Sequence, residues 1–387
     1  MILADFGPSY KSMPTMRLNI IKFDAFVIAT SPILMTYRFF ISGVSIADFL
    51  MVLSVLLHLL LGKIRSNNNL LIIGFSISLL FLHLMYAGIS GEGEVVGYFR
   101  TAKICLLLSF IMISFKDVRP KLLERYLKFF VILSLTLLCY QYFVYYIFDK
   151  SISLIIPYIP LVNSDISIDS IERVLGSHFR PGGPFMEPAH LSYYLFFCSL
   201  FIAKFNDSRN NRLLCAMAVG LFSTFSSFGF FSGVLLSIFL ARKIGSYLLI
   251  IPMVFVGVAY FLFFNDVLSQ IPQIARLIDP QSVAITGRLF AGSNNLDLLA
   301  GSQVFFGTGF GNFQMNGQVN GVNYLIVSFG YIGAGILAMI VGFNIIMRGD
   351  RLYKIFLIIT LFFSSLMLGQ MLIVALLPLW NFGERRN

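Results

Sequence analysis

The sequence predicts an all-α polytopic membrane protein of about 11 (10–12) transmembrane helices, with residues 1–387 in one membrane domain. Three observations lead to this class. Of the residues, 58% are hydrophobic and 12% are charged, whereas about a quarter are charged in soluble domains. Apolar runs long enough to cross a bilayer recur along the whole chain. Basic residues gather at every second connection between these runs.

The apolar runs define the predicted spans and leave one pair ambiguous. The seventh and eighth runs are short, and residues 223–229 separate them, which indicates either broken helices or a tight helical pair. The predicted spans cover roughly residues 20–40, 46–62, 69–88, 99–115, 127–148, 188–204, 211–224, 228–241, 244–264, 322–347 and 354–376.

The distribution of Lys and Arg predicts a cytoplasmic N-terminus. In that orientation most of the 28 basic residues lie in cytoplasmic connections, as the positive-inside rule requires. The net charge of +10 therefore has an explanation in membrane insertion, and no nucleic-acid partner is expected.

Two long loops, 149–187 and 265–321, fall on the outer side, and loops of this length are usually functional. Each carries an apolar face at helical spacing, which predicts helices along the membrane surface. These faces consist of Ile168, Ile171 and Leu175 in the first loop and Val267, Ile271, Ile274 and Ile278 in the second.

Residues 178–190, HFRPGGPFMEPAH, concentrate the candidate chemistry at the start of a predicted span. Two prolines and two glycines precede Glu187, which indicates a turn, and Pro188 suits the first turn of a helix. Glu187 at a helix start is a candidate proton acceptor, and a capping carboxylate is the alternative. His190, three residues on and roughly on the same face, is the second candidate.

Four basic residues on the outer side predict a cationic pocket. Arg180 and Arg288 lie in the two long loops, and Arg100 and Lys103 lie at the outer mouth of the fourth span. The planar guanidinium group suits phosphate oxygens. The alternative is that these residues are snorkelling anchors at the membrane surface.

The remaining polar residues predict neither a metal nor a disulfide. His58 and His83 are interpreted as core histidines, and His178 as a loop residue without a specific role. The spacing of His178, Glu187 and His190 matches no standard ligand pattern. The four cysteines lie in apolar runs without a CxxC pair.

Glycine-rich segments follow Arg288 but predict no nucleotide site. Residues 307–311, GTGFG, follow no βαβ unit and lie on the outer side, so a dinucleotide site is rejected. Gly330, Gly333 and Gly335 are expected to permit close packing of the tenth span.

These features together resemble the O-antigen polymerase (Wzy-type) family of bacterial envelopes, which is related to the O-antigen ligases. The resemblance rests on the number of spans, on an arginine in each long outer loop, on residues 180–188, RPGGPFMEP, and on Gly287-Arg288 followed by residues 307–311. It covers the topology from end to end, although its motifs are short.

The resemblance implies a GT-C-like bundle in the bacterial inner membrane, with its active site facing the periplasm. The implied enzyme polymerises oligosaccharide repeat units linked to undecaprenyl pyrophosphate, by inversion and without cofactor or metal. Arg180 and Arg288, with Arg100 and Lys103, would bind the pyrophosphate, and Glu187 or His190 would act as base. Implied partners are the lipid-linked glycans, membrane lipid and, as a further candidate, a chain-length regulator protein.

One departure separates the chain from the ligases, which commonly carry a His-Asn pair at the start of the span after the second loop. Here Val322-Asn323 occupies that place, and Asn323 and Tyr324 are expected to contact substrate. A ligase-like glycosyltransferase and a flippase of lipid-linked oligosaccharides remain the alternatives. The sugar, the linkage, the type of polymer and the oligomeric state are left open.

Overall fold

The computed structural model is predominantly helical, which agrees with the all-α prediction except for one hairpin of two short strands. The described residues are 14–40, 44–60, 95–156, 158–162, 174–175, 178–205, 210–244, 296–297, 299–308, 321–341, 354–358, 360 and 370–378.

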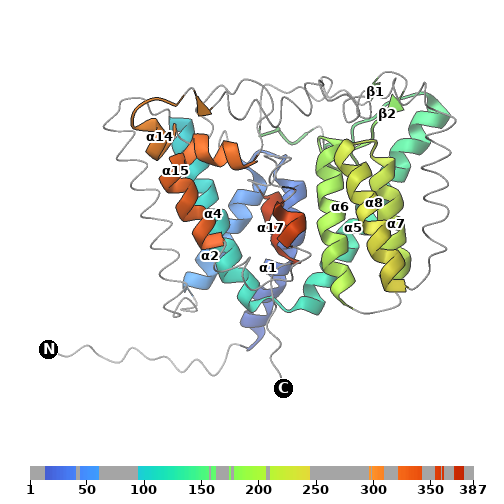
Figure 1. Ribbon diagram of the computed structural model, residues 1–387. Helices are drawn as coiled ribbons and strands as arrows, with labels where there is room; N and C mark the ends of the chain where they lie inside the picture. The colour runs from blue at the N-terminus through green and yellow to red at the C-terminus, as the bar shows by residue number, and fades with distance from the viewer. Residues whose placement is uncertain are drawn as a thin grey trace.

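One half of the helical bundle consists of α1 (Pro14–Leu34), α2 (Ile46–Leu60) and α4 (Val95–Asp117), with α2 packed against both of the others (Figure 1). A capping box begins α2. The Ser45 N–H donates to Asp48 Oδ2 at 2.8 Å, and the Asp48 N–H donates to Ser45 Oγ at 3.1 Å. This reciprocal pair fixes where the helix starts.

The other half consists of α5 (Pro120–Phe148), α6 (Pro188–Lys204), α7 (Asn210–Ser223) and α8 (Ser227–Ile244). Both α5 and α6 begin with a proline, whose fixed φ suits the first helical turn. The α1–α2 turn, the end of α5, the start of α6 and the α7–α8 turn all lie at the top of Figure 1. We call this the upper end of the bundle.

The ambiguous pair of short spans is a tight helical pair. α7 and α8 pack against each other along their length, and the turn between them contains Phe225 at a φ of 46°. Thr224 and Ser226, on either side of Phe225, are buried. Each of the two helices is continuous and makes its own backbone hydrogen bonds, so the pair is two short helices joined by a turn and not one broken helix.

Two sequence predictions about local structure were wrong. The first span was predicted to run to residue 40, but α1 ends at Leu34, and Tyr37 and Arg38 form extended bridges. Leu175 was assigned to a helical face, whereas it pairs with His178 in the hairpin of β1 (Val174–Leu175) and β2 (His178–Phe179). Backbone pairing at the upper end, which helical periodicity does not reveal, determines both segments.

The remaining described helices are α14 (Gln303–Phe306), α15 (Gly321–Val341) and α17 (Met371–Leu376). Gly330, at a φ of 66°, divides α15 into two helical segments, which meet at an angle in Figure 1. A Cβ at Gly330 would overlap the backbone of Phe305, so the close-packing prediction holds there.

The other two glycines of α15 do not support the prediction of close packing. A Cβ at Gly333 would lie 2.8 Å from the Phe329 Cβ, but Phe329 belongs to the same helix, so this contact does not show close packing against another helix. A Cβ at Gly335 would meet no described atom within 4 Å, so the described residues give no support for close packing there.

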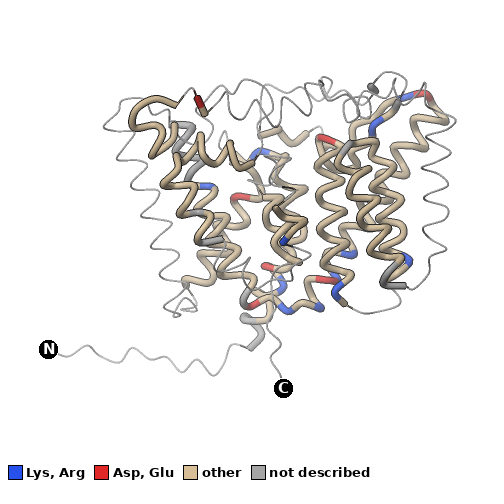
Figure 2. The backbone as a smooth tube through the Cα atoms, in the orientation of Figure 1, with Lys and Arg blue, Asp and Glu red and all other residues tan. Residues whose placement is uncertain are grey.

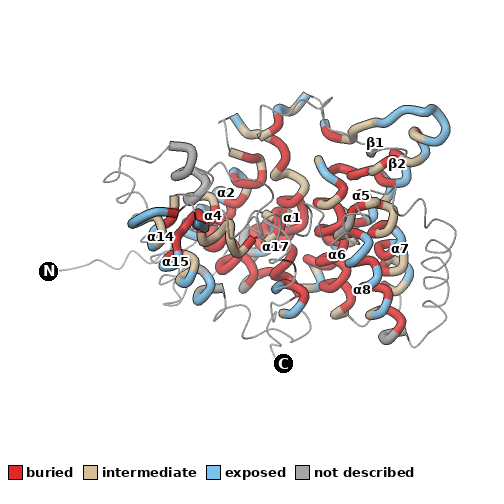
Figure 3. Tube along the Cα trace, turned by 45° about the horizontal axis from the view of Figure 1, so that its top comes forward, coloured by how far each residue is buried: buried red, intermediate tan, exposed pale blue. Residues whose placement is uncertain are grey.

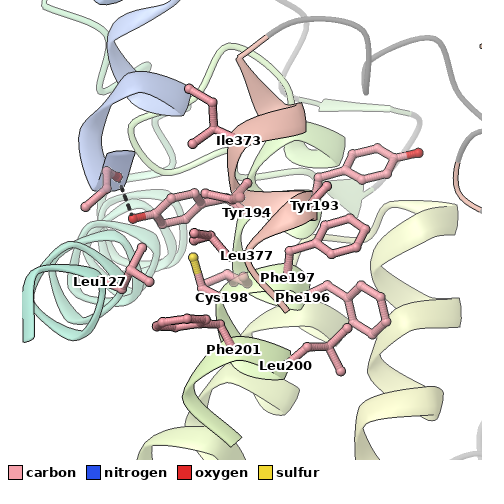
Figure 4. Close-up of a cluster of buried hydrophobic side chains, with 14 of the residues drawn as sticks. Leu127, Tyr193, Tyr194, Phe196, Phe197, Cys198, Leu200, Phe201, Ile373 and Leu377 are labelled. Atoms are coloured by element: carbon pink, nitrogen blue, oxygen red, sulfur yellow. Dashed lines mark hydrogen bonds between the residues drawn. The ribbon is translucent and has the colours of Figure 1, made fainter. Parts of the chain in front are cut away.

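The core is centred on α6, which Figure 3 shows as almost continuously buried. Its aromatic side chains, including Tyr194 and Phe201, pack against α5 and α17 (Figure 4). The Tyr194 hydroxyl donates to the Ala29 carbonyl of α1 at 3.0 Å, which joins the two halves of the bundle. The start of α6 is therefore held by packing on several sides.

Most of the predicted spans coincide with helices in their central parts. Among the described residues, α5 alone is both long and apolar enough to cross a membrane. The stretches Ile46–Leu60, Ala102–Phe115, Phe228–Ala241 and Gly321–Ile336 are apolar but shorter. The predicted span 69–88 and nearly all of 244–264 lie outside the described residues.

Candidate functional site

The segment between β2 and α6 folds back into the upper end of the bundle. Residues 181–185 are buried, and Gly183 adopts a φ of 55°. A Cβ at Gly183 would lie 3.4 Å from the Ser134 carbonyl of α5 and from Leu191 of α6. The glycine-proline sequence thus lets the backbone approach both helices closely.

A buried amide on α5 fixes this segment. Gln141 is fully buried, and its Oε1 accepts the Gly183 N–H at 2.8 Å. Its Nε2 donates to the Ile152 carbonyl at 2.9 Å. One side chain therefore holds both ends of the first long loop. Gln141 was not among the residues selected from the sequence, although a glutamine within an apolar span is a polar group that needs partners.

Aromatic contacts hold the residues on either side of Arg180. The Phe179 ring stacks on Tyr145 of α5, with ring centroids 4.4 Å apart. The Phe185 ring packs against Tyr194 of α6 at 5.4 Å. Arg180 itself is half-buried, and it follows the β2 strand directly. The guanidinium group is therefore carried by a backbone with little freedom to move.

Glu187 is the N-cap residue of α6, but its side chain is exposed and makes no capping hydrogen bond. The interpretation of Glu187 as a capping carboxylate was therefore wrong. His190 is 9% exposed, whereas Glu187 faces solvent, so the two candidate bases do not share one environment. Of the two, Glu187 has the access that a base acting on a bound hydroxyl requires.

Lys103 is paired with a carboxylate. Its Nζ lies 2.8 Å from Asp48 Oδ2, and Gln370, at the N-cap of α17, donates from Nε2 to Asp48 Oδ1 at 2.6 Å. Gln370 Nε2 also lies 3.4 Å from Ser45 Oγ. The ammonium group predicted to bind pyrophosphate is thus part of a network that joins α2, α4 and α17.

The remaining predicted site residues are placed only in part. Arg100 lies in α4, and Arg288 lies outside the described residues. Asn323 and Tyr324 are half-buried in the first turn of α15. The structure brings Arg180 and Glu187 into one fixed segment, while Lys103 belongs to the network of Asp48.

A backbone ladder joins the first long loop to the α1–α2 turn. Tyr37 pairs with Leu161, and the Arg38 N–H donates to the Pro160 carbonyl at 2.7 Å. Tyr37 and Leu161 pack in an apolar cluster that also includes Met186, the neighbour of Glu187. The α1–α2 turn, the first long loop and the start of α6 therefore meet at the upper end.

His58 is a core histidine with a partner, as predicted, but that partner is a carboxylate. His58 Nε2 lies 2.7 Å from Asp24 Oδ2, and the Ser54 hydroxyl donates to Asp24 Oδ1 at 2.5 Å. All three side chains are fully buried. His83 lies outside the described residues.

Uncharged hydroxyl groups connect α6 to the α7–α8 turn. Ser192 Oγ lies 2.8 Å from both Thr224 Oγ1 and Ser226 Oγ, and all three residues are buried. A Cβ at Gly229 would overlap Thr224 and approach Ser192 Oγ to 2.7 Å. Residues 223–229, which separate the two short spans, thus pack closely against the first turns of α6.

Within the described part of the chain, no group of three or more His, Cys, Asp or Glu side chains is arranged to hold a metal ion. Comparison of the chain with protein-family models, with curated proteins and with solved structures gave no match.

Proposed function

We propose that the protein is an integral membrane glycosyltransferase that polymerises oligosaccharide repeat units carried on undecaprenyl pyrophosphate. The observation that carries the proposal is the fixed segment from Arg180 to Glu187. It presents a guanidinium group and an exposed carboxylate from one rigid stretch at the upper end of a helical bundle.

Membrane insertion is supported by the apolar helices and by the outward-facing apolar side chains of α5. Phe129, Ile132, Phe143 and Ile147 are each more than half exposed, as expected for a helix surrounded by lipid. Figure 2 shows several charged residues at the lower end of the described bundle and fewer at the upper end. This distribution agrees with a cytoplasmic lower end.

The proposed reaction uses a leaving group that the substrate already carries. A hydroxyl oxygen of the acceptor repeat unit attacks the anomeric carbon of the donor glycan, and the bond to the pyrophosphate oxygen breaks. Glu187 accepts the hydroxyl proton, and Arg180, with Arg288, stabilises the charge on the departing pyrophosphate. His190 is the second candidate for the base. One-step displacement inverts the anomeric configuration and requires no carboxylate nucleophile.

A flippase is the second candidate, and the buried ionisable groups of the first half favour it. Asp24, His58, Asp48 and Lys103 lie inside or at the ends of predicted spans, where such groups often mark transport pathways. The exposed Glu187 at the start of α6 favours the polymerase instead.

A deletion strain distinguishes the candidates. Accumulation of single lipid-linked repeat units on the periplasmic side is the result expected for a polymerase. Repeat units trapped on the cytoplasmic side would indicate a flippase, and full-length polymer that remains unattached to lipid A would indicate a ligase. Complementation with the wild-type gene must restore the normal polymer ladder in each case.

A further inference from the structure

The Arg38 backbone is fixed between two other extended segments at the upper end. On one side its N–H donates to the Pro160 carbonyl at 2.7 Å. On the other side it forms an antiparallel bridge with Ser45, and the Phe39 N–H donates to the Val44 carbonyl at 2.8 Å. The position from which the Arg38 side chain projects is therefore set by hydrogen bonds on both sides.

The same bridge determines which way the side chain projects. Directly paired residues of antiparallel segments project from the same face, and consecutive residues project from opposite faces. Tyr37 packs in the apolar cluster with Leu161, so Arg38 projects from the other face together with Ser45. Ser45 Oγ contacts the Asp48 N–H and Gln370, which places Arg38 on the polar side of the ladder.

Among the described residues, the charges on this polar side do not balance. Asp48 Oδ2 accepts the Ser45 N–H and pairs with Lys103, while Asp48 Oδ1 accepts Gln370 Nε2–H. The carboxylate is thus neutralised by Lys103 and accepts a hydrogen bond on each oxygen. The positive charge of Arg38 remains, next to the N-terminus of α2, whose dipole adds further positive potential.

Arg38 is half-buried, and its Nε is shielded from solvent without a hydrogen-bond acceptor among the described residues. No described carboxylate pairs with its guanidinium group. The Arg38 Nε–H has lost water without gaining an acceptor among the described residues, which is costly, and the guanidinium charge has no described counter-ion. An anion supplied from outside the chain would satisfy both needs.

We propose that Arg38 binds a phosphate or pyrophosphate group at the upper end of α1 and α2, with the Asp48–Lys103 pair as the neighbouring polar surface. Its identification as the pyrophosphate of a polyprenyl lipid rests on the proposed function. In that case Arg38, rather than Lys103, is the cation that this half of the bundle contributes to the substrate, because the Lys103 ammonium group is held by Asp48.

The test is equilibrium binding to the full-length protein in phosphatidylcholine nanodiscs, with undecaprenyl pyrophosphate and inorganic pyrophosphate as the two probes. Arg38→Gln is expected to weaken binding about 10- to 100-fold, the loss of a charge-assisted contact. Arg38→Lys keeps the charge but loses the planar fork, and it is expected to lie between the wild type and Arg38→Gln. Arg119→Gln, an exposed arginine at the N-cap of α5, is the matched control and is expected to bind as the wild type does.

The outcomes separate the two sources of the anion. Arg38-dependent binding of the lipid probe alone supports a site for a membrane-borne pyrophosphate. Equal Arg38-dependent binding of both probes supports the anion site but assigns it to a soluble phosphate compound. Wild-type affinity in Arg38→Gln and Arg38→Lys for both probes, with unchanged melting temperatures, would overturn the proposal. If Arg38→Gln does not fold, wild-type affinity in Arg38→Lys overturns it.

Binding is measured without polymerisation, so this test and the proposed function can fail separately. Loss of anion binding in Arg38→Gln, together with a deletion strain that shows no defect in polymer length, would support the site and reject the polymerase. Normal binding in the Arg38 variants, together with a polymerisation defect in Arg180→Ala, would reject the Arg38 site and support the polymerase.

Discussion

The two halves of the bundle differ in the partners that their buried polar groups have. In the half formed by α1, α2 and α4, buried carboxylates pair with basic side chains from other helices, as in Asp24–His58 and Asp48–Lys103. Around the start of α6, the other half uses the Gln141 amide and a cluster of hydroxyl groups. Its described ion pair, Glu124–Lys128, lies within the first three turns of α5, at the lower end.

This difference predicts that the two halves respond differently to substitutions. An uncharged network fixes backbone positions without adding electrostatic potential, which suits the segment that carries Arg180 and Glu187. A charged network costs more when a partner is removed, because the remaining charge is left without its counter-ion. The comparison predicts that single substitutions will cost more stability in the first half than in the second.

The largest effect is expected for His58→Leu. This substitution leaves the Asp24 carboxyl group buried without its imidazole partner, and we expect the free energy of unfolding to fall by about 3–5 kcal/mol. Denaturant unfolding of the purified protein measures it. The double variant Asp24→Leu/His58→Leu removes both groups and should recover most of the loss. A double variant that is no more stable than His58→Leu would contradict this account of the pair.

A smaller, steric effect is expected for Gly229→Ala. The added methyl group would overlap Thr224 and the hydroxyl cluster, and overpacking of this kind costs about 1–3 kcal/mol. Thermal unfolding compares it with Gly335→Ala, where nothing described lies within 4 Å of the added atom. If both variants melt at the same temperature, the contact between α6 and the α7–α8 turn is not tightly packed.

Substitution of Gln141 is expected to loosen the first long loop rather than to destabilise the helical bundle. Gln141→Leu leaves the Gly183 N–H and the Ile152 carbonyl without their partner, a local cost of about 1–3 kcal/mol. Thiol labelling of Met186→Cys should therefore become faster in the Gln141→Leu background. Gln141→Glu keeps the acceptor for Gly183 and should label more slowly than Gln141→Leu. Equal labelling in all backgrounds would mean that Gln141 does not hold the segment.

The smallest effect is expected for a single hydroxyl group. Ser192→Ala removes one member of the hydroxyl cluster, and we expect a loss of about 1 kcal/mol in the free energy of unfolding. Ser223→Ala is the matched control, because among the described residues its hydroxyl bonds only to the carbonyl of Val219 one turn earlier. A loss as large as that of His58→Leu would remove the distinction between the halves.

The sequence predicted the helical class, the centres of most spans and the segment around Arg180 and Glu187, because these features are local. Apolar runs, prolines and glycines act over a few residues. Residues whose partners are distant in the chain could not be found in this way. Gln141 and Gly183 are 42 positions apart, and Asp48 and Gln370 are 322 apart.

Two contacts near the predicted site depend on residues that are distant in the chain. Lys103 was assigned to the substrate from the sequence, and its carboxylate partner, Asp48, comes from another helix. Arg38 was not selected from the sequence, because the lack of a described acceptor for its Nε depends on how three extended segments pair. A charge count along the chain cannot distinguish a cation that is already paired from one that is not.

The most direct test of the central claim is turnover by the purified full-length protein in nanodiscs, with a lipid-linked repeat unit as the only substrate. We predict that the wild type forms linked repeat units and releases undecaprenyl pyrophosphate without ATP. Glu187→Gln, which keeps the shape of the side chain but not its basicity, should lose about 10²- to 10⁴-fold in rate, and Arg119→Gln should not change it. Absence of product with the wild type, or a full rate with Glu187→Gln, would contradict the account.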